Sequence, residues 1–178
     1  MMSKDTKYNS VNSTLNAIGK TVFVNFYYDF KNPLMSEEKI AEKLYTDNPK
    51  TKSHQQGFRV PRARHLFKEK KNLEALVIIA KSERVPQETR EKAIAILIDE
   101  HNEFCKKNNI FVDSIYRHFK GNYYRIVSIG LDSESLEPII VYQDINKTER
   151  YWIRSLKDWL NPIDDQNSTR FTRIEFNH

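Results

Sequence analysis

The sequence predicts an α+β fold in which a helical N-terminal domain precedes a small β-rich C-terminal domain. Up to about residue 108, apolar residues recur at the three- and four-residue spacing of a helix face. After residue 109 the segments become short, aromatic and β-branched, and turn residues separate them. A chain of 178 residues has room for two small domains, and we expect their junction near residues 108–114.

The composition is that of a globular protein with an apolar core. Apolar residues make up 39% of the chain and charged residues 30%, and there are only four glycines, which argues against disorder. No stretch approaches the roughly 18 apolar residues that a membrane-spanning helix needs. The first ten residues are polar and lack the apolar segment of a signal peptide. The single cysteine, Cys105, excludes an internal disulfide, so we expect a cytoplasmic protein with no membrane partner.

The first part of the chain contains several helix signals. Residues 1–20 are polar, and we expect them to be only partly ordered. Residues 21–31 fit both a helix face and a strand alternation, and we favour a helix because the segments that follow are helical. Ser36 is expected to cap a further helix, which ends at Asn48-Pro49.

Two longer helices are expected in the remainder of the helical domain, which spans residues 21–108. The first begins near residue 51 or 53 and either kinks at Pro61 or restarts there, because proline disrupts a helix interior. A short apolar element over 73–80 follows. The most regular pattern is a helix over 87–107, whose apolar face is Ile94, Leu97, Ile98, His101 and Cys105.

The C-terminal domain, residues 114–178, has the composition of an antiparallel meander. Its strand-like segments are 123–131, 138–143, 151–154 and 171–176. Turn residues separate these segments, for example at Gly121-Asn122. We expect the strands to close into a small barrel or sheet, with one helical turn over 156–160 crossing an end of it.

Positive charge is concentrated between residues 50 and 71. This segment holds eight lysines and arginines and one acid, a net charge of +7 in a chain whose total is +5. Such a local stripe suggests a polyanionic partner, because lysine and arginine neutralise phosphates and arginine and glutamine can read base edges. The alternative is a solvated face that pairs with the acidic segment 83–100. The candidate nucleic-acid or polyanion-binding residues are Lys52, His54, Gln55, Gln56, Arg59, Arg62, Arg64 and Lys68.

A series of motifs follows the domain junction. Tyr116-Arg117-His118-Phe119-Lys120-Gly121 comes first, then Val141-Tyr142, and then Trp152 with Arg154. In this order the segment 114–176 resembles a small bacterial and phage domain family of unknown function. The resemblance implies a five-stranded SH3-like barrel and no established activity. The N-terminal part resembles, more weakly, helix-turn-helix-like segments, through Arg59, Ala63, Arg64, Phe67 and Lys68.

The aromatic residues of the C-terminal domain have two interpretations. They either fill the core of a small barrel or form a stacking platform for a ligand, and the core is the commoner case. We expect Trp152 to lie in the core and Arg154 to be the polar anchor of a site, because an unpaired arginine is costly to bury. The candidate residues of a barrel site are Tyr116, His118, Lys120, Tyr142, Trp152 and Arg154.

Metal binding and catalysis have little support in the sequence. His101 and Cys105 are four residues apart on a helix and could chelate, but a structural zinc site needs four ligands. We find no glycine-rich phosphate loop, nucleophile elbow or HExxH motif. We therefore expect no enzyme, no metal and no cofactor.

Two functional hypotheses remain. In the first, the protein is a non-enzymatic nucleic-acid-binding regulator that docks through its helices, with self-association, such as a homodimer, or a second contact through the barrel. In the second, it is a phage-type interaction protein or inhibitor that binds a host protein or a nucleotide-like small molecule.

Overall fold

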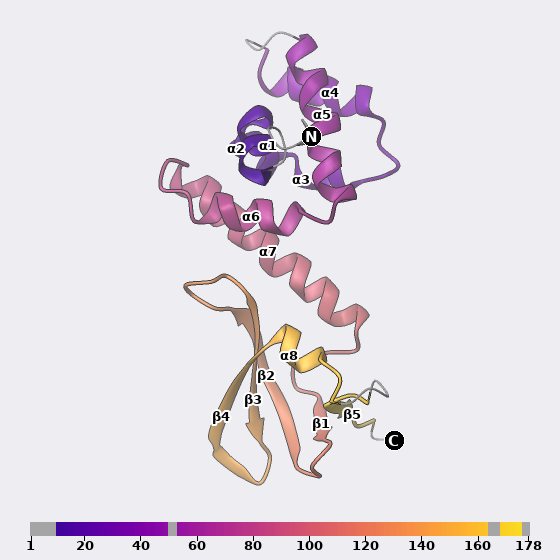
Figure 1. Cartoon of the computed structure of the whole chain (residues 1–178), viewed down its shortest axis with the longest axis vertical. Coiled ribbons are helices and arrows are strands. Elements are labelled where there is room, and N and C mark those ends of the chain that lie inside the picture. Colours follow the sequence, from indigo (N-terminus) through magenta and orange to yellow (C-terminus); the bar gives the residue numbers. More distant parts are fainter. Residues whose placement is uncertain (1–9, 50–52, 164–167, 176–178) are drawn as a thin grey trace, which may run out of the picture. The chain divides into compact units, whose positions relative to one another are not determined.

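The computed structural model describes residues 10–49, 53–163 and 168–175, and their side chains except at 53–56 (Figure 1). The chain divides into two compact units, with unit 1 ending at Leu97 and unit 2 beginning at Ile98, inside one helix. A helical region comes first and a five-stranded antiparallel sheet second, which confirms the predicted α+β class. The domain limits expected near 108–114 stay a prediction.

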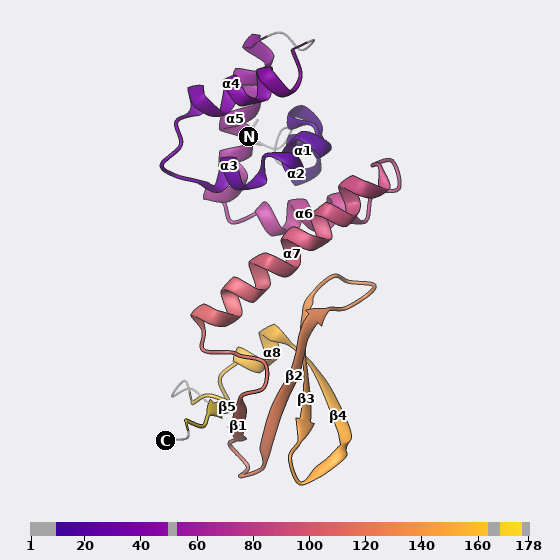
Figure 2. The same cartoon turned by 180° about the vertical axis from the view of Figure 1, so that it is seen from behind.

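The helices of unit 1 follow the expected pattern except for the first helix and for a break at Phe26 that divides the segment 21–31 into two helices. They are α1 (Val11–Ile18), α2 (Lys20–Asn25), α3 (Tyr27–Lys31), α4 (Glu37–Asp47), α5 (Ser53–Lys68) and α6 (Asn72–Ala80), and α7 (Gln87–Lys107) begins here (Figures 1 and 2). The helical interpretation of residues 21–31 is confirmed. So is the cap of α4, where the Ser36 hydroxyl accepts a hydrogen bond from the Lys39 N–H at 3.3 Å.

Helix α1 was not predicted, and it lies in the stretch that the sequence suggested is only partly ordered. Residues 1–9 of that stretch lie outside the described residues. Ser10 caps the helix by accepting a hydrogen bond from the Ser13 N–H at 3.1 Å. Val11, Leu15 and Ile18 are buried at helical spacing. Most of the residues between these three are polar, so the segment as a whole read as polar and its apolar helix face was not recognised.

Helix α5 continues through Pro61 as a single element, so a restart at Pro61 is wrong. Pro61 is exposed, and it has no N–H to donate to the carbonyl four residues earlier. Val60, Ala63 and Leu66 are buried on one face of α5, and this packing offsets the lost hydrogen bond. Arg62 and Lys68 are exposed on α5, whereas Arg59 and Arg64 are half-buried.

An aromatic core holds unit 1 together. The Phe23 ring meets the rings of Tyr27 and Phe67 at centroid distances of 5.7 and 6.0 Å. The Tyr27 side chain is fully buried, and its hydroxyl accepts a hydrogen bond from Asn72 Nδ2 at 2.7 Å. Helices α1, α2, α3, α5 and α6 thus share one core, and α5 is fixed in it along one face.

Unit 2 contains the end of α7, β1 (Ile115–His118), β2 (Tyr123–Leu131), β3 (Pro138–Asp144), β4 (Lys147–Ser155), α8 (Leu156–Leu160) and β5 (Phe171–Arg173). The strand order is β4-β3-β2-β1-β5, and all neighbours are antiparallel. The four expected strands and the helical turn are confirmed, but β1 was not among them, β4 begins earlier, at Lys147, and β5 ends at Arg173. Figure 2 shows β2, β3 and β4 side by side, with α8 following directly on β4.

The sheet is strongly curved, with its core on the concave face. In a flat sheet β3 and β5 would lie about 14 Å apart, at about 4.8 Å per strand. The rings of Tyr142 on β3 and Phe171 on β5 nevertheless meet at a centroid distance of 5.6 Å. Trp159 of α8 stacks on Phe171 at 3.8 Å and meets Tyr116 and Tyr142 edge to face at 5.4 Å. Helix α8 therefore fills the concave face.

Candidate functional site

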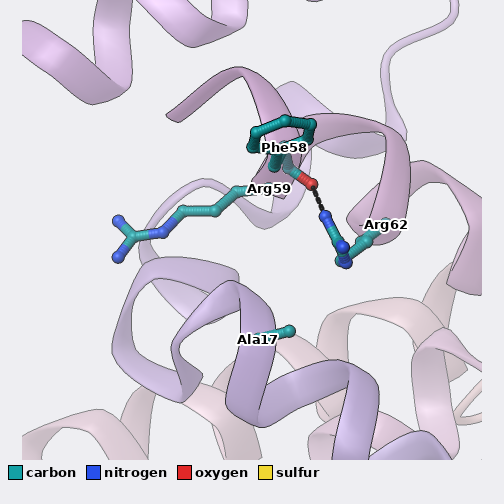
Figure 3. Close-up of a pocket in the computed structure, with 4 residues that line it drawn as sticks. All are labelled: Ala17, Phe58, Arg59 and Arg62. Atoms are coloured by element: carbon teal, nitrogen blue, oxygen red, sulfur yellow. Dashed lines mark hydrogen bonds between the residues drawn. The ribbon is translucent and has the colours of Figure 1, made fainter. Parts of the chain in front are cut away.

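A hollow with a volume of about 430 Å³ lies between α1 and the exposed face of α5. It is lined by Ala17, Phe58, Arg59 and Arg62 (Figure 3). Figure 3 shows the two arginine side chains extending to opposite sides of the hollow. We call Phe58, Arg59 and Arg62 the basic surface. They occupy the middle of the segment that the sequence singled out for its charge.

The Phe58 side chain dominates this surface. It is 61% exposed, which is unusual for a large apolar ring on a helix that also contributes to a core. The Arg62 guanidinium lies 5.8 Å from the ring centroid and donates a hydrogen bond to the Phe58 carbonyl at 2.7 Å. Arg62 is thus held beside the ring while its remaining N–H groups are available to a ligand.

Arg64 has a structural role in unit 1. Its Nη2 donates to the Asn32 carbonyl at 3.2 Å and also to the Met35 carbonyl, so it holds the loop between α3 and α4. The pKa of Glu38 lies below its usual range, chiefly because of a backbone hydrogen bond and the Ser36 hydroxyl, with Arg64 adding its charge. A part for Arg64 in polyanion binding stays a prediction.

The other candidates of this stripe are less well defined. Lys68 is exposed near the end of α5. Lys52 lies outside the described residues, and so do the side chains of His54, Gln55 and Gln56 in the first turn of α5. The proposal below therefore depends on the basic surface itself.

Of the candidate residues of the sheet, two are buried in its core and the others are partly or fully exposed. Tyr116 and Tyr142 are buried in the aromatic core. The Tyr116 hydroxyl donates to the Asn109 carbonyl and accepts from the Phe111 N–H, both at 2.9 Å. Burial raises the pKa of Tyr116. Both tyrosines therefore serve the structure of unit 2.

Trp152 is not a core residue, contrary to the expectation. Its side chain is 48% exposed, whereas that of Trp159 is 4% exposed. Trp152 and Tyr142 are partners in the β3–β4 ladder, but β4 is the edge strand of the sheet. A residue on an edge strand has no neighbouring strand on one side, which leaves Trp152 partly exposed. The buried tryptophan is Trp159, which α8 places over the concave face.

Arg154, His118 and Lys120 belong to one group of basic residues, which also includes Arg170. We call these four residues the cationic cluster. The pKa of His118 lies below its usual value. Burial is the largest cause, and the positive charges of Arg170, Lys120 and Arg154 add to it. Arg154 is on β4 and His118 on β1, so the curvature of the sheet brings together residues from strands that are not neighbours.

The structure adds three residues to those that the sequence suggested. Phe58 could have been found, since it is an aromatic residue inside a basic run, a pattern typical of nucleic-acid contact. Phe119 carries the same signal, since it lies between His118 and Lys120 in the motif already noted, but Arg170 carries none. Arg170 precedes a short strand, and only the pairing of β1 with β5 brings it to Phe119.

Metal binding gains no support from the described side chains. Among them no group of three or more histidine, cysteine or acidic residues could hold an ion. Cys105 is buried, and burial raises its pKa to about 11, so it is held as a thiol. In the described part of the chain, no helix has both the length and the apolar character that crossing a membrane requires.

Comparison with known proteins gives a match only for unit 2. Residues 114–173 match the family model described as "Protein of unknown function (DUF1653)". The matched segment includes all five strands and α8. No curated protein and no solved structure matches the chain. The C-terminal sheet therefore matches a domain of unknown function, and nothing names the N-terminal helices.

Proposed function

We propose that the protein is a non-enzymatic nucleic-acid-binding regulator and that the basic surface of unit 1 contacts the nucleic acid. The observation that carries the proposal is the exposed Phe58 ring beside Arg62, in the middle of the most positive segment of the chain. An exposed aromatic ring flanked by guanidinium groups offers a base a stacking partner and the phosphates two cations.

Unpaired bases suit this surface better than a duplex. Stacking on an aromatic side chain requires a base whose face is free, and each stacked base contributes about 1–3 kcal/mol. Arg59 and Arg62 extend to opposite sides of the hollow, an arrangement that suits phosphates on either side of a stacked base (Figure 3). Single-stranded nucleic acid is therefore the preferred partner.

Two finer features of the fold are part of this proposal. Helices α4 and α5 pack against each other and would form a helix-turn-helix-like pair, of which α5 presents the basic surface. The curved sheet of unit 2 would close into a small SH3-like barrel, with β4 approaching β5. The contact between Tyr142 and Phe171 across three strand intervals supports this closure.

The experiment measures fluorescence anisotropy of a labelled single-stranded oligonucleotide with the full chain. Arg59→Glu with Arg62→Glu should abolish binding, because each reversal replaces an attraction for phosphate with a repulsion. Phe58→Ala should weaken binding by about 5- to 150-fold, the equivalent of one stacked base.

Lys107→Glu with Lys157→Glu is the matched control, since both lysines are exposed and the net charge changes by the same amount. The control should retain most of the affinity. If the control loses as much as the double arginine variant, binding depends on net charge alone and the proposed surface is wrong. Equal affinity of Phe58→Ala and wild type would remove the stacking role.

A further inference from the structure

Two arginines of unit 2 have buried atoms without hydrogen-bond partners. The Nε atoms of Arg154 and Arg170 are buried and unpartnered among the described residues. A buried donor left unsatisfied costs roughly 1–3 kcal/mol, so such atoms call for an explanation. The Nε atoms of Arg64 and Arg90 in unit 1 are in the same state, but Arg64 donates through Nη2 and neither belongs to a group of cations of this kind.

Phe119 organises the cationic cluster. The Lys120 Nζ and the Arg170 Cζ lie 5.7 and 5.8 Å from the centroid of its ring. The ring of His118 lies 4.4 Å from that of Phe119. The Phe119 N–H donates to the Arg170 carbonyl at 3.0 Å, which fixes the chain before β5 against the end of β1. Lys120, Arg170 and His118 are therefore gathered around one ring.

No ion pair neutralises this charge in the described part of the chain. Ion pairs among the described residues include Lys43–Asp29, Lys106–Glu103 and Arg150–Glu149. None of these includes a member of the cationic cluster, which thus holds three permanent positive charges without an acidic partner among the residues that the structure describes. Like charges repel one another, and the repulsion grows as water is excluded.

The His118 ring has one hydrogen-bond donor, which lies on Nε2. Its Nδ1 accepts a hydrogen bond from the Lys120 N–H at 3.4 Å, which is possible only when Nδ1 carries no proton. The neutral ring then carries its proton on Nε2. The lowered pKa of His118 agrees with this state, since burial and the three neighbouring cations disfavour a charged ring.

We propose that the cationic cluster of His118, Lys120, Arg154 and Arg170 is a binding site for the phosphate group of a phosphate monoester. Two guanidinium forks, one ammonium and one imidazole N–H offer more donors than a carboxylate can accept, and they match a dianion with three terminal oxygens. The bound phosphate would accept from the Nη groups of the two guanidinium forks, which are not among the buried unpartnered atoms, and would neutralise the repulsion. The site is separate from the basic surface and does not rest on the function proposed for it.

The same phosphate chemistry has three sources: inorganic phosphate, a nucleoside 5′-monophosphate and the 5′-phosphorylated end of a nucleic acid. Calorimetric titration of the full chain with sodium phosphate, with adenosine 5′-monophosphate and with a 5′-phosphorylated oligonucleotide separates them. The oligonucleotide titrations use the Arg59→Glu, Arg62→Glu chain and compare the 5′-phosphate with a 5′-hydroxyl end. Because this chain lacks both arginines of the basic surface, any preference for the 5′-phosphate end reports on the cationic cluster alone.

Arg154→Met and Arg170→Met should each weaken phosphate binding roughly tenfold or more, since each removes a charge-assisted contact. Both variants should unfold at the same urea concentration as the wild type or a higher one, because an unsatisfied buried Nε donor and an unpaired positive charge are removed. Arg125→Met, on an exposed position of β2, is the control and should bind normally. Lys120→Gln, also exposed, tests the site without touching buried atoms and should weaken binding severalfold.

The proposal is overturned if the wild-type chain binds none of the three phosphate species. It is equally overturned if Arg154→Met, Arg170→Met and Lys120→Gln bind phosphate as the wild type does. Marked destabilisation of the methionine variants, with phosphate binding intact in Lys120→Gln, would show that the two arginines serve the fold.

Discussion

Replacing each tryptophan in turn tests the architecture of unit 2. Trp159→Ala removes a 4%-exposed side chain that stacks on Phe171 at 3.8 Å and meets two tyrosines edge to face. A core Trp→Ala change costs about 3–5 kcal/mol. A unit of this size has a free energy of unfolding of roughly 4–12 kcal/mol, so the loss is a large part of the total. Trp152→Ala removes a 48%-exposed side chain and should cost about 1 kcal/mol.

Urea unfolding followed by tryptophan fluorescence provides the measurement. The chain has two tryptophans, both in unit 2, so each variant keeps one reporter of that unit. Amide hydrogen exchange of β2 and β3 gives a second probe that does not depend on either ring. The reasoning is refuted if Trp152→Ala destabilises unit 2 as much as Trp159→Ala, because Trp152 would then lie in the core.

Three further outcomes are expected. Arg64→Ala should lower the free energy of unfolding of unit 1 by about 1.5–3 kcal/mol in urea titrations, because the Asn32 and Met35 carbonyls lose a charged donor; an unchanged midpoint would contradict this role. Burial lowers the pKa of His101, so as pH falls the unfolded chain binds a proton at this residue before the folded chain does. The folded state should therefore lose stability as pH falls below about 6.5. In a His101→Gln variant the urea concentration at the unfolding midpoint should change less between pH 7.5 and 5.5 than in the wild type. Cys105, with its pKa raised to about 11, should react with a thiol reagent at pH 8 only after denaturant is added, and rapid reaction of the native chain would count against its burial.

Local signals were sufficient for most of the secondary structure. The strands β2 and β3 and the helices α7 and α8 begin where the sequence indicated, because capping, proline and turn residues act over a few positions. Helix α1 was missed because its three buried residues are spaced among polar ones. The ambiguous segment 21–31 was settled by packing, since Phe23 and Tyr27 meet at 5.7 Å within one helical core.

The candidate sites were harder to predict, for reasons that lie beyond local sequence. The charge of the α5 segment was visible, but the use of Arg64 as a clamp on the loop before α4 depends on tertiary contacts. Which tryptophan is buried depends on strand order, since β4 is an edge and α8 returns over the concave face. Arg170 joins Arg154 only because the sheet curves, and no spacing in the sequence encodes that proximity.

The salt dependence of binding tests the central claim most directly. The affinity of the full chain for a single-stranded oligonucleotide is measured over roughly 50 to 200 mM salt, and each neutralised phosphate contributes about −0.7 to the slope of log K against log salt. With Arg59 and Arg62 as contacts, we expect a slope of about −1.4, falling to near zero in Arg59→Ala with Arg62→Ala. A wild-type slope near zero, or a slope that the double variant leaves unchanged, would contradict nucleic-acid binding through the basic surface.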